Sequence, residues 1–147
     1  MKIYLGSDHA GFKLKEQLKA YLVKKGYNCI DIGPKSYNKN DDYPDYIIPV
    51  ARKVAKDNRS KGIILGGSGQ GEALAANKIK GIRATVYYGG SIKIIKLSRE
   101  HNNANVLSLG ARFLTEKEAK RAVSVWLKTN FSKAKRHVRR LNKIKRR

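Results

Sequence analysis

The residues best suited to chemistry lie in a glycine-rich segment, Gly66-Gly67-Ser68-Gly69-Gln70-Gly71-Glu72. Glycines let backbone N–H groups approach an anion, and the start of a following helix adds about half a positive charge there. The amides near Gly69 and Gly71, together with the Ser68 hydroxyl, could stabilise an oxyanion that develops on a substrate. Glu72 would lie in the first helical turn, where its carboxylate could remove a proton from a carbon next to a carbonyl.

Two alternatives stay open for this segment. Its glycines could simply shape a turn, with Glu72 stabilising the helix dipole. Burial could raise the pKa of Glu72, or the dipole and nearby cations could lower it, and the sequence does not decide between them.

The same segment departs from both common nucleotide-binding patterns. In the phosphate-binding loop G-x-x-x-x-G-K-[ST], Glu72 and Ala73 stand where Lys and Ser/Thr are required. In the dinucleotide pattern G-x-G-x-x-G, Gly67 and Gly69 are followed by Glu72 in place of the third glycine. We therefore expect no nucleotide cofactor.

The histidines and the single cysteine give no sign of a metal centre. His9 follows Asp8 at the end of a strand-like run, whereas His137 lies in a basic helix whose simplest reading is solvent exposure. Neither these nor His101 falls into a zinc-ligand spacing such as H-E-x-x-H, and Cys29 alone cannot build a sulfur site. We expect no metal and no disulfide, which fits a reducing, cytoplasmic compartment.

Short apolar runs alternate along the chain with longer helical patterns. A parallel crossover needs about a dozen residues or more, so the long connections predict parallel strands. The predicted fold is a single Rossmann-like three-layer α/β/α domain with about five parallel strands. Residues 1–130 would form its body, and residues 131–147 a basic C-terminal helix and tail of the same domain. Strands are expected at residues 2–6, 28–32, 62–66, 83–87 and 105–109, and helices at 11–25, 44–57, 71–79, 91–100, 116–128 and 131–145.

In such a sheet, ligands bind beyond the carboxyl ends of the strands. Asp8 and His9 follow the first expected strand, the glycine-rich segment follows the third, and Arg112 follows the fifth. We therefore expect these side chains to gather at one pocket.

The formal net charge of +22 raises the question of nucleic acid. Ten Lys and Arg residues lie within residues 128–147, and the rest of the excess is spread along the chain. No aromatic residues are interleaved as a stacking platform, and no zinc-finger or helix-turn-helix signature is present. We expect only non-specific binding to nucleic acid, and no membrane span because no apolar run approaches ~20 residues.

Several short motifs follow one another over about residues 1–142. They are Gly6-Ser7-Asp8-His9-Ala10-Gly11, Asp42-Tyr43-Pro44, Gly67-Ser68-Gly69, Ala75-Ala76-Asn77-Lys78, Gly81-Ile82-Arg83-Ala84, residues 98–105 (SREHNNAN), Gly110-Ala111-Arg112 and Arg136-His137. Taken in order, they resemble one family: the ribose-5-phosphate isomerase B and lactose-pathway galactose-6-phosphate isomerase family. One branch of that family carries a catalytic Cys at the position of Gly66, whereas this chain resembles the actinobacterial-type branch, in which the base is the Glu at position 72.

The resemblance implies an aldose–ketose isomerase that needs no metal or cofactor. His101 and Asp8 would open the furanose ring, Glu72 would move a proton between C2 and C1 through a cis-enediolate, and Ser68 would hold the enediolate. His101, Asn102 and Arg112 would come from a neighbouring subunit, so a homodimer or dimer of dimers with shared sites is implied. The implied substrate-binding residues are His9, Tyr43, Gly67, Gly69, Gly71, Asn102, Arg112, Arg136, His137 and Arg140.

The substrate is left open at this point. Ribose 5-phosphate leads, and a six-carbon sugar phosphate, such as allose 6-phosphate or galactose 6-phosphate, is the nearest alternative. A basic nucleic-acid-binding protein on the same fold is the alternative from a different class.

Overall fold

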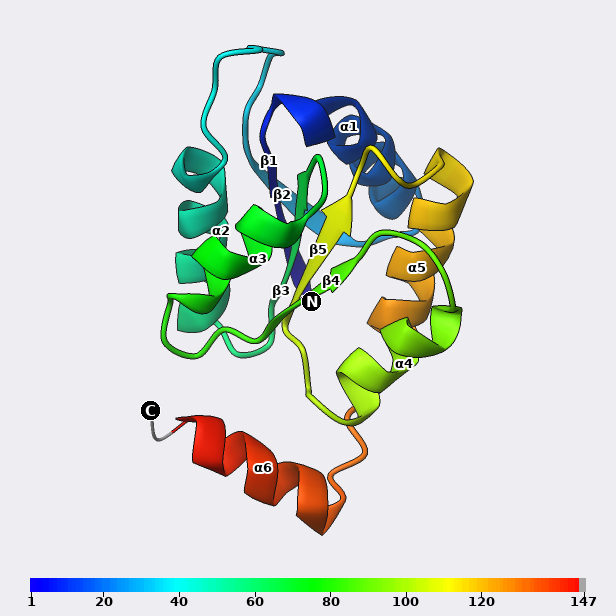
Figure 1. The fold of residues 1–147 in the computed structure, drawn as a ribbon. Coiled ribbons are helices and arrows are strands. Elements are labelled where there is room, and N and C mark those ends of the chain that lie inside the picture. Colours follow the sequence, from blue (N-terminus) through cyan, green and yellow to red (C-terminus); the bar gives the residue numbers. More distant parts are fainter. Residues whose placement is uncertain (146–147) are drawn as a thin grey trace.

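The computed structural model describes residues 1–145 and contains one five-stranded parallel sheet with the strand order β2-β1-β3-β5-β4. Helices follow the strands in alternation, and Figure 1 shows the resulting α/β body. The elements are β1 (Lys2–Ser7), α1 (His9–Lys24), β2 (Asn28–Gly33), α2 (Pro44–Lys56), β3 (Lys61–Gly66), α3 (Gln70–Asn77), β4 (Ala84–Tyr87), α4 (Ile92–Glu100), β5 (Val106–Gly110), α5 (Glu116–Lys128) and α6 (Lys135–Lys145).

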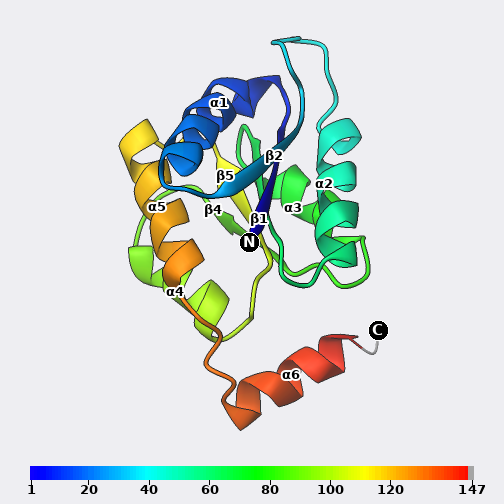
Figure 2. The ribbon, with the colours of Figure 1, turned by 180° about the vertical axis from the view of Figure 1, so that it is seen from behind.

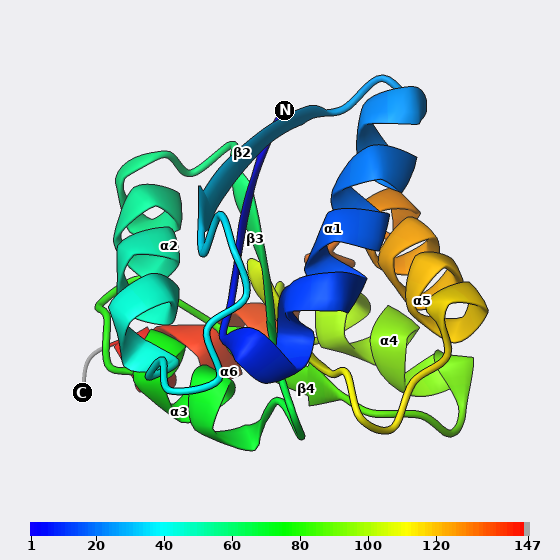
Figure 3. The same ribbon diagram turned by 90° about the horizontal axis from the view of Figure 1, so that it is seen from above.

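Helices cover both faces of the sheet, which confirms the predicted three layers. Helices α1, α4 and α5 pack on one face, and α2 and α3 pack on the other, as the view from above shows (Figure 3). Alternate residues along β1 serve the two faces, because Ile3 and Leu5 join the first cluster and Tyr4 joins the second. A strand covered on both faces has no need of polar alternation, which is why these strands are nearly continuous apolar runs.

The strand register brings the ends of the central strands together. In the pairing of β3 with β5, Gly66 lies opposite Gly110, and in the pairing of β1 with β3, Ser7 lies opposite Leu65. The loops that leave β1, β3 and β5 therefore emerge side by side at the carboxyl ends of the strands. This end of the sheet is called its carboxyl edge.

The helix starts that differ most from those expected are those of α1 and α6. Helix α1 begins at His9 rather than at residue 11, because the Asp8 side chain caps it by accepting the Gly11 N–H at 3.1 Å. Helix α6 begins at Lys135, so the expectation of a helix from residue 131 was wrong. Lys133 has a φ of +59°, a left-handed conformation that no α-helix contains.

Helix α6 lies beyond the amino ends of the strands, on the side opposite the loops that leave the carboxyl edge (Figures 1 and 2). The segment of residues 129–134 connects it to α5, and a hydrogen bond from the Ser132 N–H to the Glu100 carbonyl, 3.1 Å long, ties this segment to the end of α4. Within residues 1–145, no helix is both long enough and apolar enough to cross a membrane.

Candidate active site

The residues expected at the carboxyl edge gather there. Register and loop hydrogen bonds bring the ends of β3 and β5 together, since the Ala111 N–H donates to the Gly66 carbonyl at 2.8 Å and the Arg112 N–H to the Gly67 carbonyl at 3.1 Å. A methyl group on Gly67 would lie 3.0 Å from Nη1 of Arg112, so the guanidinium lies over the glycine-rich loop of its own chain.

This placement of Arg112 differs from the one that the resemblance implied. The side chain was expected to serve the site of a neighbouring subunit, and it lies instead beside its own glycine-rich loop. The reason is topological: β5 is the neighbour of β3 in the sheet, so the loops that follow them are neighbours as well.

Glu72 is buried in the first turn of α3, with 4% of its surface exposed. Burial raises the pKa of its carboxyl group, and the negative charge of Asp8 raises it further. The backbone N–H groups of Glu72 and Gly69 act in the opposite direction and do not cancel the rise. Of the two directions left open by the sequence, burial therefore prevails, and the group is a stronger base than an ordinary glutamate.

The Glu72 carboxylate occupies the space that a side chain at position 66 would need. A methyl group at position 66 would lie 2.5 Å from Oε2 of Glu72, and closer still to Oε1 and to the carboxyl carbon. A side chain at position 66 and this orientation of Glu72 therefore exclude each other. A Cys at position 66, which the resemblance assigns to another branch, is therefore incompatible with this orientation of Glu72.

Glycines also shape the loop around the start of α3. Gly69 has a φ of +79°, which a residue with a side chain rarely adopts. A methyl group on Gly71 would lie 2.8 Å from the hydroxyl oxygen of Tyr43, so the Tyr43 ring packs over the first turn of α3. The Ser68 hydroxyl accepts the Gln70 N–H at 3.3 Å.

Ser108 was not predicted from the sequence as a site residue, and it anchors this loop to β5. Ser108 is fully buried in β5, and its hydroxyl donates to the Gly69 carbonyl at 2.6 Å. A single hydroxyl inside the apolar run Val106–Gly110 was the available signal, because a buried polar group in a strand needs a partner.

Asp41, which contacts His9, was not predicted from the sequence either. Oδ1 of Asp41 accepts the His9 backbone N–H at 3.0 Å and lies 2.7 Å from Nδ1 of the ring. The signal was an acid directly before the Asp42-Tyr43-Pro44 motif.

Asp8, His9 and Asp41 are also the cluster with the spacing of a metal site, since one ligand atom from each lies within 4.8 Å of the others. Oδ1 of Asp8 already accepts the Gly11 N–H, and Oδ1 of Asp41 accepts two groups of His9. These hydrogen bonds account for the cluster, so we assign no metal to it.

The remaining expected residues lie at the opposite edge of the sheet. His101 caps the C-terminus of α4, and its ring stacks on that of His137 from α6, with centroids 4.0 Å apart and an interplanar angle of 18°. His137 is buried, contrary to the solvated helix that was its simplest reading, whereas Arg136 and Arg140 are exposed. Desolvation lowers the pKa of His137, with smaller contributions from His101, Arg136 and Arg140.

Two groups of candidate residues therefore lie at opposite ends of the parallel strands within one chain. Asp8, His9 and the loop of residues 66–72 stand at the carboxyl ends of the strands, and His101 and His137 stand at the amino ends. Asn102, Arg136 and Arg140 lie with the second group, by their positions beside His101 and on α6.

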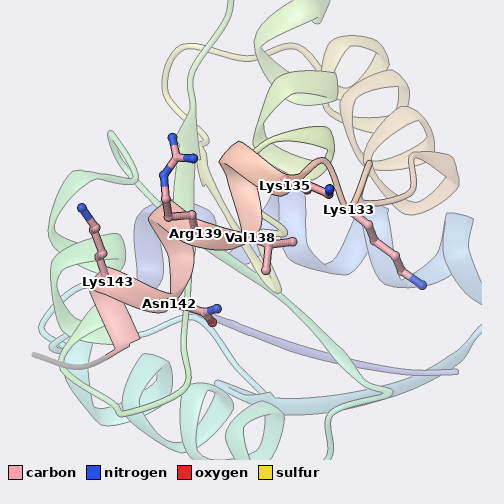
Figure 4. A pocket seen from close by; sticks show the side chains of 6 residues that line it. All are labelled: Lys133, Lys135, Val138, Arg139, Asn142 and Lys143. Atoms are coloured by element: carbon pink, nitrogen blue, oxygen red, sulfur yellow. The ribbon is translucent and has the colours of Figure 1, made fainter.

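A hollow along α6 lies on the same side as this second group (Figure 4). Its lining is mostly cationic and lies away from Glu72, so it is no part of the glycine-rich site. The lining residues are Lys133, Lys135, Val138, Arg139, Asn142 and Lys143.

Comparison with known proteins agrees with the motifs. A family model described as Ribose/Galactose Isomerase matches residues 3–144. The chain is 46% identical over 142 residues to ribose-5-phosphate isomerase B of Mycolicibacterium paratuberculosis, an alignment that covers 97% of this chain and 88% of that protein.

Solved structures give the same answer. The structure of ribose-5-phosphate isomerase B from Mycoplasma genitalium with bound ribulose-5-phosphate matches with a TM-score of 0.94 and 43% identity, covering 99% of this chain and 94% of that one. The enzyme from Clostridium thermocellum matches with a TM-score of 0.93 and 42% identity, covering 99% and 96%. The chain therefore belongs to the ribose/galactose isomerase family, as its ordered motifs indicated.

Proposed function

We propose that this sugar-phosphate isomerase interconverts ribose 5-phosphate and ribulose 5-phosphate. The relatives named ribose-5-phosphate isomerase B support this substrate, and so does the similarity to a structure that holds ribulose-5-phosphate. The observation that carries the proposal is Glu72, a buried carboxylate of raised pKa at the start of a helix whose preceding loop is rich in glycine.

Glu72 removes the proton from C2 of the open-chain aldose, which leaves a cis-enediolate, and then returns the proton to C1. The proton of the C2 hydroxyl passes to O1, so that C2 becomes the carbonyl carbon of the ketose. A base whose pKa is raised toward the working pH both accepts and returns a proton readily. The developing negative charge lies near the amides of the loop and the Ser68 hydroxyl, which stabilise it as an oxyanion hole does.

The remaining candidate residues open the sugar ring and bind the phosphate. His101 and Asp8 transfer protons between the ring oxygen and the anomeric hydroxyl. The substrate phosphate binds His9, Arg112, Arg136 and Arg140, since a guanidinium meets phosphate oxygens through two parallel hydrogen bonds. Asn102 and His137 border the same site, Tyr43 lines it, and no metal or cofactor takes part.

The site is shared between two copies of the chain, in a homodimer or a dimer of dimers. This proposal rests on the separation of the two groups at opposite edges of the sheet. A second copy that presents its His101 and α6 to the carboxyl edge of the first completes the set. Such an enzyme acts in the cytoplasm, and its basic surface binds nucleic acid only non-specifically.

A coupled assay with a panel of five- and six-carbon aldose phosphates tests the proposed reaction. We expect the highest kcat/KM with ribose 5-phosphate. A higher value with allose 6-phosphate or galactose 6-phosphate would move the assignment to a six-carbon substrate. No turnover with any sugar, combined with tight binding to one nucleic-acid sequence at physiological salt, would refute the isomerase assignment.

A further inference from the structure

The contact between Asp41 and His9 does more than cap a helix. One oxygen, Oδ1, accepts both the backbone N–H of His9 and the ring Nδ1–H, at 3.0 Å and 2.7 Å. The first of these bonds satisfies a free N–H at the start of α1, which is an ordinary structural task. The second bond satisfies no backbone group. It fixes the orientation of the ring and the position of the proton on Nδ1.

Asp41 is poorly compensated without the His9 ring. Its side chain is 3% exposed, and Oδ2 is buried with no hydrogen-bond partner among residues 1–145. Buried carboxylates are costly unless they are paired with a positive or proton-donating group. In the described part of the chain, the side chain that meets this need is the His9 ring.

The His9 ring is thereby held in one orientation. Nδ1 faces the buried carboxylate, and the ring makes a T-shaped contact with that of Tyr37, with centroids 6.2 Å apart and an interplanar angle of 88°. The two ring nitrogens lie on different sides of an imidazole, so Nε2 is turned away from Asp41. The His9 side chain keeps 26% of its surface exposed at the carboxyl edge of the sheet.

We propose that Asp41 is a positioning residue for His9: its carboxylate keeps the proton on Nδ1 and aims Nε2 at the phosphate group of the substrate. This inference rests on the proposed function. Nδ1–H then donates to Asp41, and Nε2, when it carries a proton, donates to a phosphate oxygen. The arrangement resembles the carboxylate that fixes the tautomer of a histidine at catalytic and metal sites.

Two variants and a control separate this role from a structural one. Asp41→Ala removes the carboxylate, and Asp41→Asn keeps a carbonyl oxygen at the same place without the charge. Asp45→Ala removes the same charge from an exposed position in the first turn of α2. We expect KM for ribose 5-phosphate to rise about tenfold in Asp41→Ala, since a charge-assisted hydrogen bond to phosphate is weakened, with kcat within about threefold.

The Asp41→Asn variant should fall between wild type and Asp41→Ala, and Asp45→Ala should keep the wild-type KM. A kcat loss with unchanged KM, or an equal effect in Asp45→Ala, would overturn the proposal. If Asp41→Ala does not fold, Asp41→Asn decides: an unchanged KM in that variant would be the contrary result.

Two readouts do not depend on turnover. Long-range ¹⁵N–¹H NMR correlations, assigned by their loss in His9→Gln, should show the Nδ1–H form in wild type and Asp41→Asn and the Nε2–H form in Asp41→Ala. Titration with inorganic phosphate should show weaker binding in Asp41→Ala. An unchanged tautomer in a folded Asp41→Ala would refute the inference even if the isomerase activity is as proposed. An inactive wild type with the expected tautomers would refute the proposed function alone.

Discussion

A side chain added at Gly66 should displace the base, because the three atoms nearest to it all belong to the Glu72 carboxylate. Gly66 ends β3, and its backbone packs against the Glu72 carboxylate so closely that a methyl group would lie 2.5 Å from Oε2. Carbon and oxygen atoms in contact stand about 3.5 Å apart, so the carboxylate of Gly66→Ala must move by at least about 1 Å. A displacement of about 1 Å at a reacting group costs on the order of 10²-fold in rate.

The kinetic assay is isomerisation of ribose 5-phosphate by purified Gly66→Ala. We expect kcat to fall about 10²-fold while KM changes little, since no group assigned to the phosphate is moved. The matched control is Gly62→Ala in the same strand, where the new methyl group meets three valine side chains at 3.1–3.2 Å in the core. This control should lower thermal stability and leave kcat near the wild-type value. A wild-type kcat in folded Gly66→Ala would refute the steric reasoning and the assigned position of the base.

Three further predictions follow from charges and topology. Burial, and then the charge of Asp8, raise the pKa of Glu72, so the acid limb of the kcat/KM profile should lie above the ordinary glutamate value of 4.5. In Asp8→Asn this limb should move to lower pH, and a limb at the same pH in both proteins would contradict the assignment. Inactive Glu72→Gln and inactive His101→Ala chains should recover part of the activity once subunit exchange is verified, because a mixed dimer keeps one intact site; no recovery would argue against shared sites. Burial alone would raise the pKa of Asp31, but hydrogen bonds from Lys15 and Lys19 lower it from 3.8 to about 2. This lowered pKa gives stability that is present above about pH 4 and lost as the pH falls toward 2. Acid unfolding of Asp31→Asn should lack that loss, on the order of 1–2 kcal/mol, and an acid profile like that of wild type would exclude Asp31 as its source.

The strands and the polar loops could be predicted because their signals are local. Each strand is a short apolar run, and the rule that ligands bind beyond the carboxyl ends of parallel strands placed Asp8, Ser68 and Glu72 together. The direction of the Glu72 pKa could not be predicted, since it depends on how deeply the side chain is buried and on its proximity to Asp8. Both depend on packing between elements that are far apart in the sequence.

Contacts across the fold account for what was missed. Asp41 meets His9 across 32 residues, and Ser108 meets Gly69 across 39 residues. Neither pair has a sequence spacing that marks it. The burial of His137 escaped prediction for the same reason, because its partner His101 belongs to another helix end.

Glu72→Gln gives the most direct test of the claim that Glu72 transfers the proton. The change keeps the shape of the side chain and removes the base, so it acts on proton transfer and not on the phosphate contacts. In D₂O, the rate of ribulose 5-phosphate formation and of deuterium incorporation should fall on the order of 10²–10⁴-fold, with KM for ribose 5-phosphate nearly unchanged. A variant that isomerises ribose 5-phosphate at the wild-type kcat would show that Glu72 is not the base.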